Sequence, residues 1–200
     1  MELEKEKRND YDLMQRVRNG DMLAFSQIVD KYKNRLMNVI GRMVQGNEEA
    51  EDIVQETFMR VYQHRDSFDF RHCFSTWLYT IALNLARNEL RKRKRFKFFD
   101  IFDLQGKEAE IAVEMELPSN LPQALERAIE GLPDKYKMAF VLRDVQELPY
   151  EEVAQIMNIP LGTVKSRVNR ARAILKDKLQ PRMEEYNALS KGTLLPVSIL

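Results

Sequence analysis

The sequence is poor in the residues that interrupt helices or cross-link chains. It contains seven glycines, seven prolines and one cysteine in 200 residues, with few runs of alternating β-branched residues. Alanine, leucine, glutamate, lysine and arginine are abundant, and these residues favour helices. The composition therefore predicts an all-α fold. The single cysteine, Cys73, excludes an intrachain disulfide.

The sequence also lacks a long hydrophobic run. Its longest nearly uncharged stretch, around residues 76–88, is too short for a bilayer and is broken by Asn84 and Arg87. The first residues, MELEKEKRND, are charged where a signal peptide would be apolar. We therefore expect a cytoplasmic protein without a membrane span.

A catalytic constellation is missing as well. There is no glycine-rich nucleotide loop. His72 and Cys73 are adjacent and His64 precedes them by eight residues, but no further ligands follow at the regular spacing of a metal site. Asp52 and Glu56 could share a Mg²⁺ in a nuclease, yet no third acid or nucleophile activator accompanies them. We expect no enzymatic activity, no cofactor and no metal.

What the sequence does contain is an uneven distribution of charge, hidden by a net charge of only +1. Residues 87–97 and residues 160–182 each hold seven basic side chains and one acid. Between them, residues 100–122 hold six acids and one base. Two basic blocks that flank an acidic strip point to a nucleic-acid partner.

Apolar residues recur at helical spacing on both sides of the acidic strip. Asp21 and Asn47 are expected to cap the first two amphipathic helices, and a third runs from about Ser75 to Arg95. After the strip, Pro122, Pro133 and Pro149 mark the starts of further helices. These patterns predict two small helical domains joined by a flexible acidic linker, followed by a tail without an assigned role: 1–96, 97–120, 121–185 and 186–200.

The second basic block has the layout of a helix-turn-helix motif. A short helix at 149–157 precedes a tight turn with Pro160 and Gly162, and a basic helix at about 162–180 follows. At 100° per residue, one side of this helix forms an apolar seam of Val164, Val168, Ala171 and Leu175. The opposite side carries Ser166, Asn169 and Arg170, flanked by Lys165, Arg167 and Arg172.

The chemistry of this face suits DNA. Arginine and asparagine make bidentate contacts to guanine and adenine edges, while flanking cations neutralise phosphates. A solvated helix face would instead mix acids with bases at i, i+4. We expect Ser166, Asn169 and Arg170 to read bases and Lys165, Arg167 and Arg172 to contact phosphates.

The helix from Ser75 is apolar around most of its circumference. The remaining narrow stripe consists of Thr80, Asn84, Arg87 and Arg91, which suits a strand of DNA with bases near Asn84 and phosphates near the arginines. The preceding loop is rich in aromatic residues. Trp77 is expected to close the core. Phe68 is expected to be exposed as part of a pocket for an unstacked base, and closure of the domain core is the alternative.

The helix EDIVQETFMRVYQ exposes a polar stripe of Asp52, Gln55, Glu56 and Met59. A solvated face explains this stripe adequately, and docking of a partner protein is the alternative.

Several motifs in order give the chain a family resemblance. The motifs cover about residues 10–183 and read GDMLAFSQIVDKY, EDIVQETFMRVY, DSF with FSTWLYTIALNLARNELRKRKR, and LPDKYKMAFVLRDVQELPYEEVAQIMNIPLGTVKSRVNRAR. With these motifs the chain resembles bacterial RNA polymerase sigma factors, specifically the extracytoplasmic-function class of the sigma-70 family. The resemblance implies that sigma domain 2 reads and melts the minus-10 promoter element and that sigma domain 4 reads the minus-35 element.

The resemblance also implies roles for individual residues. Phe68 and Asn84 occupy positions that hold the flipped-out base and its neighbours. Asp52, Gln55 and Glu56, with Met59 on the same stripe, match the surface that docks on the clamp helices of the polymerase β′ subunit. Minus-35 base contacts fall on Lys165, Ser166, Asn169 and Arg170, and a phosphate contact falls on Arg143. Further implied partners are the β flap of core polymerase, promoter DNA in duplex and single-stranded form, and an anti-sigma factor.

Two other functions remain open from the residues. A stand-alone helix-turn-helix repressor would bind a palindromic duplex without polymerase, with half-sites about one helical turn apart. A DNA-processing enzyme would use Asp52 and Glu56 for metal-dependent cleavage.

Overall fold

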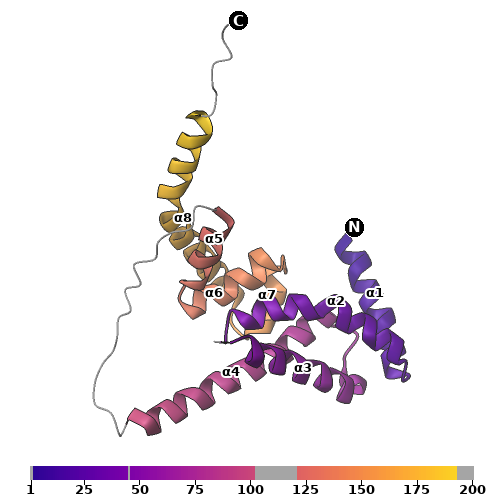
Figure 1. Ribbon diagram of the computed structural model, residues 1–200. Coiled ribbons are helices and arrows are strands. Elements are labelled where there is room, and N and C mark those ends of the chain that lie inside the picture. Colours follow the sequence, from indigo (N-terminus) through magenta and orange to yellow (C-terminus); the bar gives the residue numbers. More distant parts are fainter. Residues whose placement is uncertain (1, 45, 102–120, 193–200) are drawn as a thin grey trace, which may run out of the picture.

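The fold consists of helices and turns throughout the described part of the chain (Figure 1). The computed structural model describes residues 2–44, 46–101 and 121–192, with side chains described within 7–44, 46–92 and 123–180. Before the acidic strip lie α1 (Glu2–Arg18), α2 (Met22–Gly41), α3 (Asn47–Gln63), the 3₁₀ turn η1 (Arg65–Ser67) and α4 (Phe74–Ile101). After it lie α5 (Leu121–Glu130), α6 (Asp134–Phe140), the π-helical turn η2 (Val141–Val145), α7 (Tyr150–Met157) and α8 (Leu161–Gly192). The all-α prediction is confirmed.

The first domain is built around α2, which contacts α1, α3 and α4. Apolar residues recur every three or four positions along α2, so they share one side of the helix. This buried side consists of Ala24, Ile28, Tyr32, Leu36, Val39 and Ile40. At the start of the helix the Asp21 carboxylate accepts hydrogen bonds from the backbone N–H groups of Leu23 and Ala24, as predicted.

A buried polar contact fastens α1 to α2. The hydroxyl of Tyr32 donates to Asp10 Oδ2 at 2.6 Å, and Lys31 forms an ion pair with the other oxygen of the same carboxylate. Asp10 is almost fully buried. Because a buried carboxylate is costly unless it is paired and hydrogen-bonded, this arrangement specifies how α1 lies on α2.

The second domain contains the predicted helix-turn-helix. Helices α7 and α8 are joined by residues 158–160, where Asn158 adopts a left-handed conformation (φ 54°, ψ 52°) and ends α7. Asparagine tolerates this conformation better than most residues. The predicted seam is confirmed, because Val164, Val168, Ala171 and Leu175 are all buried.

Several predicted boundaries were wrong. Asn47 is the first residue of α3 and does not cap it, since the cap position is Gly46. Gly162 lies inside α8 and not in the turn. Helix α4 extends to Ile101, so residues 97–101 of the predicted linker are helical, and α8 continues to Gly192. The rest of the linker, 102–120, and residues 193–200 of the tail lie outside the described residues.

The two domains touch. Helix α7 of the second domain packs against α4 of the first, next to the stripe predicted to bind DNA. None of the described helices is long and apolar enough to cross a membrane.

Candidate nucleic-acid interface

The recognition helix α8 presents a polar face to solvent. Lys165, Ser166, Asn169 and Arg170 are exposed, as expected for residues that read bases from this helix. Ser166 donates its hydroxyl proton to the Thr163 carbonyl at 2.9 Å, and the Lys165 ammonium lies 5.9 Å from the Tyr150 ring centroid. The long cationic side chains of this face can therefore approach a groove, since no other described element covers them.

Two of the predicted phosphate contacts are already engaged within the domain. Arg172 binds Asp144 through two hydrogen bonds, at 2.8 Å from Nε and 2.6 Å from Nη2. This hydrogen-bonded carboxylate raises the pKa of Arg172. Arg143 lies 4.8 Å from the Tyr150 ring centroid and donates weakly to the Leu148 carbonyl at 3.4 Å. A phosphate would have to compete with these partners, and neither partner was predicted from the sequence.

The stripe on α4 is divided between solvent and the second domain. Asn84 and Arg91 are exposed, while Thr80 and Arg87 are half-buried. The Thr80 hydroxyl donates to the Thr76 carbonyl at 2.7 Å, within the helix. Arg87 reaches across the domain boundary and donates to the Met157 carbonyl at 3.4 Å. The four residues share one side of α4 as predicted, but part of that side lies against α7.

The prediction that Phe68 is exposed is wrong. Only 3% of the surface of Phe68 is accessible. The centroid of its ring lies 4.9 Å from the ring centroid of Phe70, 5.8 Å from that of Phe74 and 5.2 Å from that of Trp77. Four aromatic rings therefore close the end of the first domain together. Edge-on and tilted ring pairs of this kind add to the energy of burial. The role of Phe68 beside a captured base stays a prediction.

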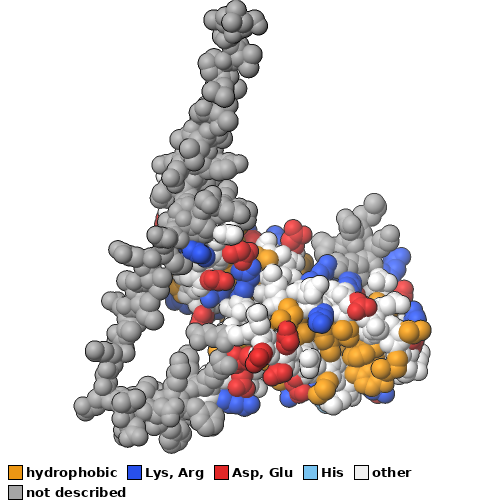
Figure 2. All heavy atoms as spheres, in the orientation of Figure 1, with side chains coloured by type: hydrophobic (Ala, Val, Ile, Leu, Met, Phe, Trp, Pro, Cys, Tyr) orange, Lys and Arg blue, Asp and Glu red, His pale blue; other side chains and the backbone are white. Residues whose placement is uncertain are grey.

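The stripe on α3 faces solvent beside a groove. Asp52 and Gln55 are exposed, 53% of Met59 is accessible, and Glu56 forms an ion pair with Arg60 at 2.7 Å. A groove of about 780 Å³ runs between α3 and α4, and its lining contains two cations, Arg60 and Lys92, and five acids: Glu48, Glu49, Asp52, Glu56 and Glu89. Acidic side chains gather on the visible face beside an apolar area (Figure 2). The surface thus offers both charge and apolar contact to a partner.

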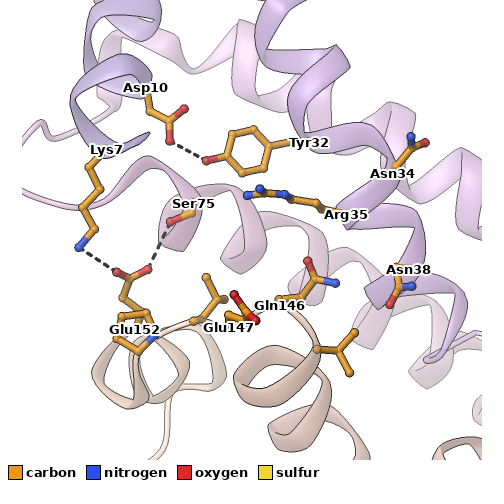
Figure 3. Close-up of a pocket in the computed structure, with 13 residues that line it drawn as sticks. Lys7, Asp10, Tyr32, Asn34, Arg35, Asn38, Ser75, Gln146, Glu147 and Glu152 are labelled. Atoms are coloured by element: carbon orange, nitrogen blue, oxygen red, sulfur yellow. Dashed lines mark hydrogen bonds and ion pairs between the residues drawn. The ribbon is translucent and has the colours of Figure 1, made fainter. Parts of the chain in front are cut away.

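Sequence reasoning missed the contact that joins the domains. Glu152 of α7 is buried and accepts hydrogen bonds from the hydroxyls of Thr76, at 3.1 Å, and Ser75, at 3.3 Å, while Lys7 forms an ion pair with it at 3.2 Å (Figure 3). These partners come from α4 and α1. A second polar contact runs from the Tyr79 hydroxyl to the Gln146 side chain, at 3.1 Å. The signal for this contact in the sequence was an acid, Glu152, on the otherwise apolar side of α7.

The charge of Glu152 affects its neighbours. Burial alone lowers the pKa of Lys7, but the hydrogen bond and the charge of Glu152 outweigh it, so the pKa lies above its ordinary value. Burial, followed by the Glu152 carboxylate, raises the pKa of the Cys73 thiol. Cys73 is therefore a protonated, weakly nucleophilic thiol at neutral pH. No group of three or more metal-binding side chains occurs among the residues that the structure describes.

We expect Glu152→Ala to shift the protein towards separated domains. The change leaves two hydroxyls and one ammonium without their acceptor, which costs about 1–3 kcal/mol, or about 5- to 150-fold in the ratio of closed to open forms. The measurement is the radius of gyration from small-angle X-ray scattering, which should rise. Glu151→Ala removes the same charge from an exposed neighbouring position and should leave the radius unchanged. An unchanged radius in Glu152→Ala would show that this contact does not hold the domains together.

The chain has two helical domains, each with a basic face, and the second domain contains a helix-turn-helix. These features define the class of protein. Two families match these domains. Sigma-70 region 2 matches residues 28–96, and Sigma-70 region 4 matches residues 122–175. Both matches fall within the predicted domain limits.

Relatives along the whole chain narrow the class further. The chain is 39% identical over 178 residues to the ECF RNA polymerase sigma factor SigW of Bacillus subtilis, covering 84% of this chain and 95% of the relative. It is 37% identical to the ECF RNA polymerase sigma-E factor of Haemophilus influenzae, covering 89% of this chain and 99% of that protein. The chain belongs to the extracytoplasmic-function class of RNA polymerase sigma factors, and it acts as a sigma subunit that directs transcription from specific promoters.

A solved structure supports the same assignment. The sigma factor RpoE from Bartonella quintana, in a co-crystal structure with the anti-sigma factor NepR, is 29% identical. Its TM-score to this chain is 0.64, with 78% of this chain and 96% of that one covered. These relatives do not favour a stand-alone repressor.

Proposed function

We propose that the two domains divide promoter recognition between them. The first domain, within 1–96, captures the melted minus-10 strand on α4 through Thr80, Asn84, Arg87 and Arg91, with Phe68 beside the flipped-out base. The second domain, within 121–185, reads the minus-35 element with α8. The observation that carries this proposal is the exposed face of Lys165, Ser166, Asn169 and Arg170 on the second helix of a helix-turn-helix, opposite a fully buried seam.

The closed arrangement cannot be the one that acts on a promoter. Two elements centred about 25 base pairs apart are separated by about 85 Å of duplex. Helices α4 and α7, which pack together here, would have to move apart to reach both. The chain between Ile101 and Leu121 can span at most about 70 Å when fully extended. This length and the width of the two domains together are sufficient to reach both promoter elements. Promoter binding thus requires Glu152 to leave Ser75 and Thr76.

The stripe on α3 is proposed to dock on the clamp helices of the polymerase β′ subunit, and the second domain on the β flap. The exposed carboxylate of Asp52 next to the exposed Met59 supports this assignment, because charge guides association and apolar burial stabilises it. The protein would work in the cytoplasm, where it has no catalytic activity of its own. An anti-sigma factor is a proposed partner, as in the complex of RpoE with NepR.

The test is transcription by core polymerase and the purified chain on a pool of promoters. We expect a subset of start sites to fire, and we expect Asp52→Arg to weaken core binding at least tenfold through charge reversal at the interface. Glu51→Arg makes the same change of charge one position away and should bind as the wild type does. If the chain neither copurifies with core polymerase nor changes the pattern of start sites, the proposed division of labour is wrong.

A further inference from the structure

A small basic pocket lies between the two domains. Its volume is about 240 Å³, and its lining residues come from the turn after α2 and from α4 on one side and from α6, α7 and α8 on the other. The five cations are Arg42 and Arg87 from the first domain and Lys135, Lys137 and Arg167 from the second. The single acid among the lining residues is Asp134.

The positive charge of the pocket is poorly balanced. Arg42 is paired with Glu126, but among the described residues Lys137 forms an ion pair with Asp134 alone, at 3.9 Å with 96% of the Asp134 side chain exposed. An exposed pair at that distance contributes little. Arg167 forms no ion pair with the described residues.

Arg87 is the least balanced of these cations. Its hydrogen bonds go to neutral acceptors, the Asn84 side chain and the Met157 carbonyl, both at 3.4 Å. Within the described part of the chain no carboxylate forms an ion pair with it. Burial, and secondarily the nearby charge of Arg91, lower the pKa of Arg87. The closed arrangement thus places a partly desolvated guanidinium among cations from the other domain, which is unfavourable without an anion.

We propose that this pocket binds a small compound with two or more linked phosphate groups and that the bound compound holds the two domains together. Arginine and lysine are the side chains that bind phosphate oxygens. The volume is below the roughly 300–1,000 Å³ of pockets for drug-sized ligands, so it suits a chain of phosphates. Apolar side chains, among them Met138 and Met157, line the same pocket and could receive the base of a nucleotide.

Binding of the polyphosphate would oppose promoter recognition. This regulatory effect goes beyond the proposed function. Arg87 and Arg167 line the pocket here, and both are predicted to contact DNA in the open form. A bound polyphosphate therefore occupies the same cations and keeps α4 against α7. The ligand and the promoter would compete for one protein, as two ligands do when each binds a different conformation.

The test is isothermal titration of the full chain with inorganic tripolyphosphate and, separately, with ATP. We expect saturable binding at one site per chain. Lys137→Met should weaken it about tenfold, because it removes one charge while keeping the partly buried stem of the side chain. Lys176→Met removes an exposed charge of α8 outside the pocket and should bind as the wild type does. Lys135→Met, at an exposed pocket position, is the second variant if Lys137→Met does not fold.

The outcomes are distinct. Tighter binding of ATP than of tripolyphosphate would support a nucleotide, and equal binding would support recognition of the phosphates alone. The radius of gyration should fall on binding. Sodium sulfate that binds equally well at matched ionic strength would overturn the proposal, as would equal weakening by Lys176→Met. Binding of a single-stranded oligonucleotide that depends on Lys137, without binding of tripolyphosphate, would assign the pocket to DNA and also overturn it.

Discussion

Phe68→Ala is expected to lower the free energy of unfolding by about 3–5 kcal/mol, the usual cost of removing a buried aromatic ring. Phe68 packs against Phe70, Phe74 and Trp77, and the cavity left behind could close only if those rings moved. Urea unfolding followed by circular dichroism gives the measurement. Leu23→Ala, at a position with 74% of its surface accessible, is the control and should change stability little. A loss below 1 kcal/mol in Phe68→Ala would contradict the packing described for Phe68.

A second substitution separates packing from strand capture at the same position. Phe68→Leu keeps most of the apolar volume and removes the aromatic face. If Phe68 also contacts the captured base, this variant should fold and yet open promoters more slowly, since stacking contributes about 1–3 kcal/mol per base. Unchanged opening would restrict Phe68 to the core of the first domain.

Arg170→Ala is expected to reduce initiation about 5- to 150-fold on promoters whose minus-35 element offers the matching base. The side chain is exposed on the base-reading face of α8, and one bidentate contact to a base discriminates by about 1–3 kcal/mol. The measurement is transcription from a set of promoters that differ at single minus-35 positions.

The control for this experiment lies on the same helix. Lys176→Ala removes a charge from an exposed position beyond the recognition face and should have a small effect that is equal on all promoters. The contrary result for Arg170→Ala, an equal loss on every promoter, would make Arg170 a phosphate contact, because phosphates carry no sequence information.

Local periodicity explains what could be predicted from the sequence. Val164, Val168, Ala171 and Leu175 lie three or four residues apart, so their common burial follows from helix geometry alone. The cap at Asp21 needs only the two residues that follow it. The all-α fold and the two domains rest on such signals, and each of them involves residues within a few positions of one another.

Long-range contacts explain what could not be predicted. Arg172 appeared available for phosphate, but Asp144 lies 28 positions earlier and meets it only after α8 has packed on α6. Glu152 joins residues that are 76 and 77 positions away. The burial of Phe68 depends on the packing of two rings from the loop, Phe68 and Phe70, against Phe74 and Trp77 of α4, so no single spacing could indicate it.

Trp77 gives this protein a built-in optical reporter. It is the only tryptophan in the sequence, it is half-buried, and its ring lies 5.2 Å from Phe68 at the start of α4. Tryptophan emission, excited selectively over that of the seven tyrosines, therefore originates at one place, beside the proposed strand-binding stripe and two positions from Ser75, which binds Glu152. Arrival of a DNA base at the proposed stripe or departure of α7 is expected to change the surroundings of that indole, so that both events can be followed in real time in the unlabelled protein.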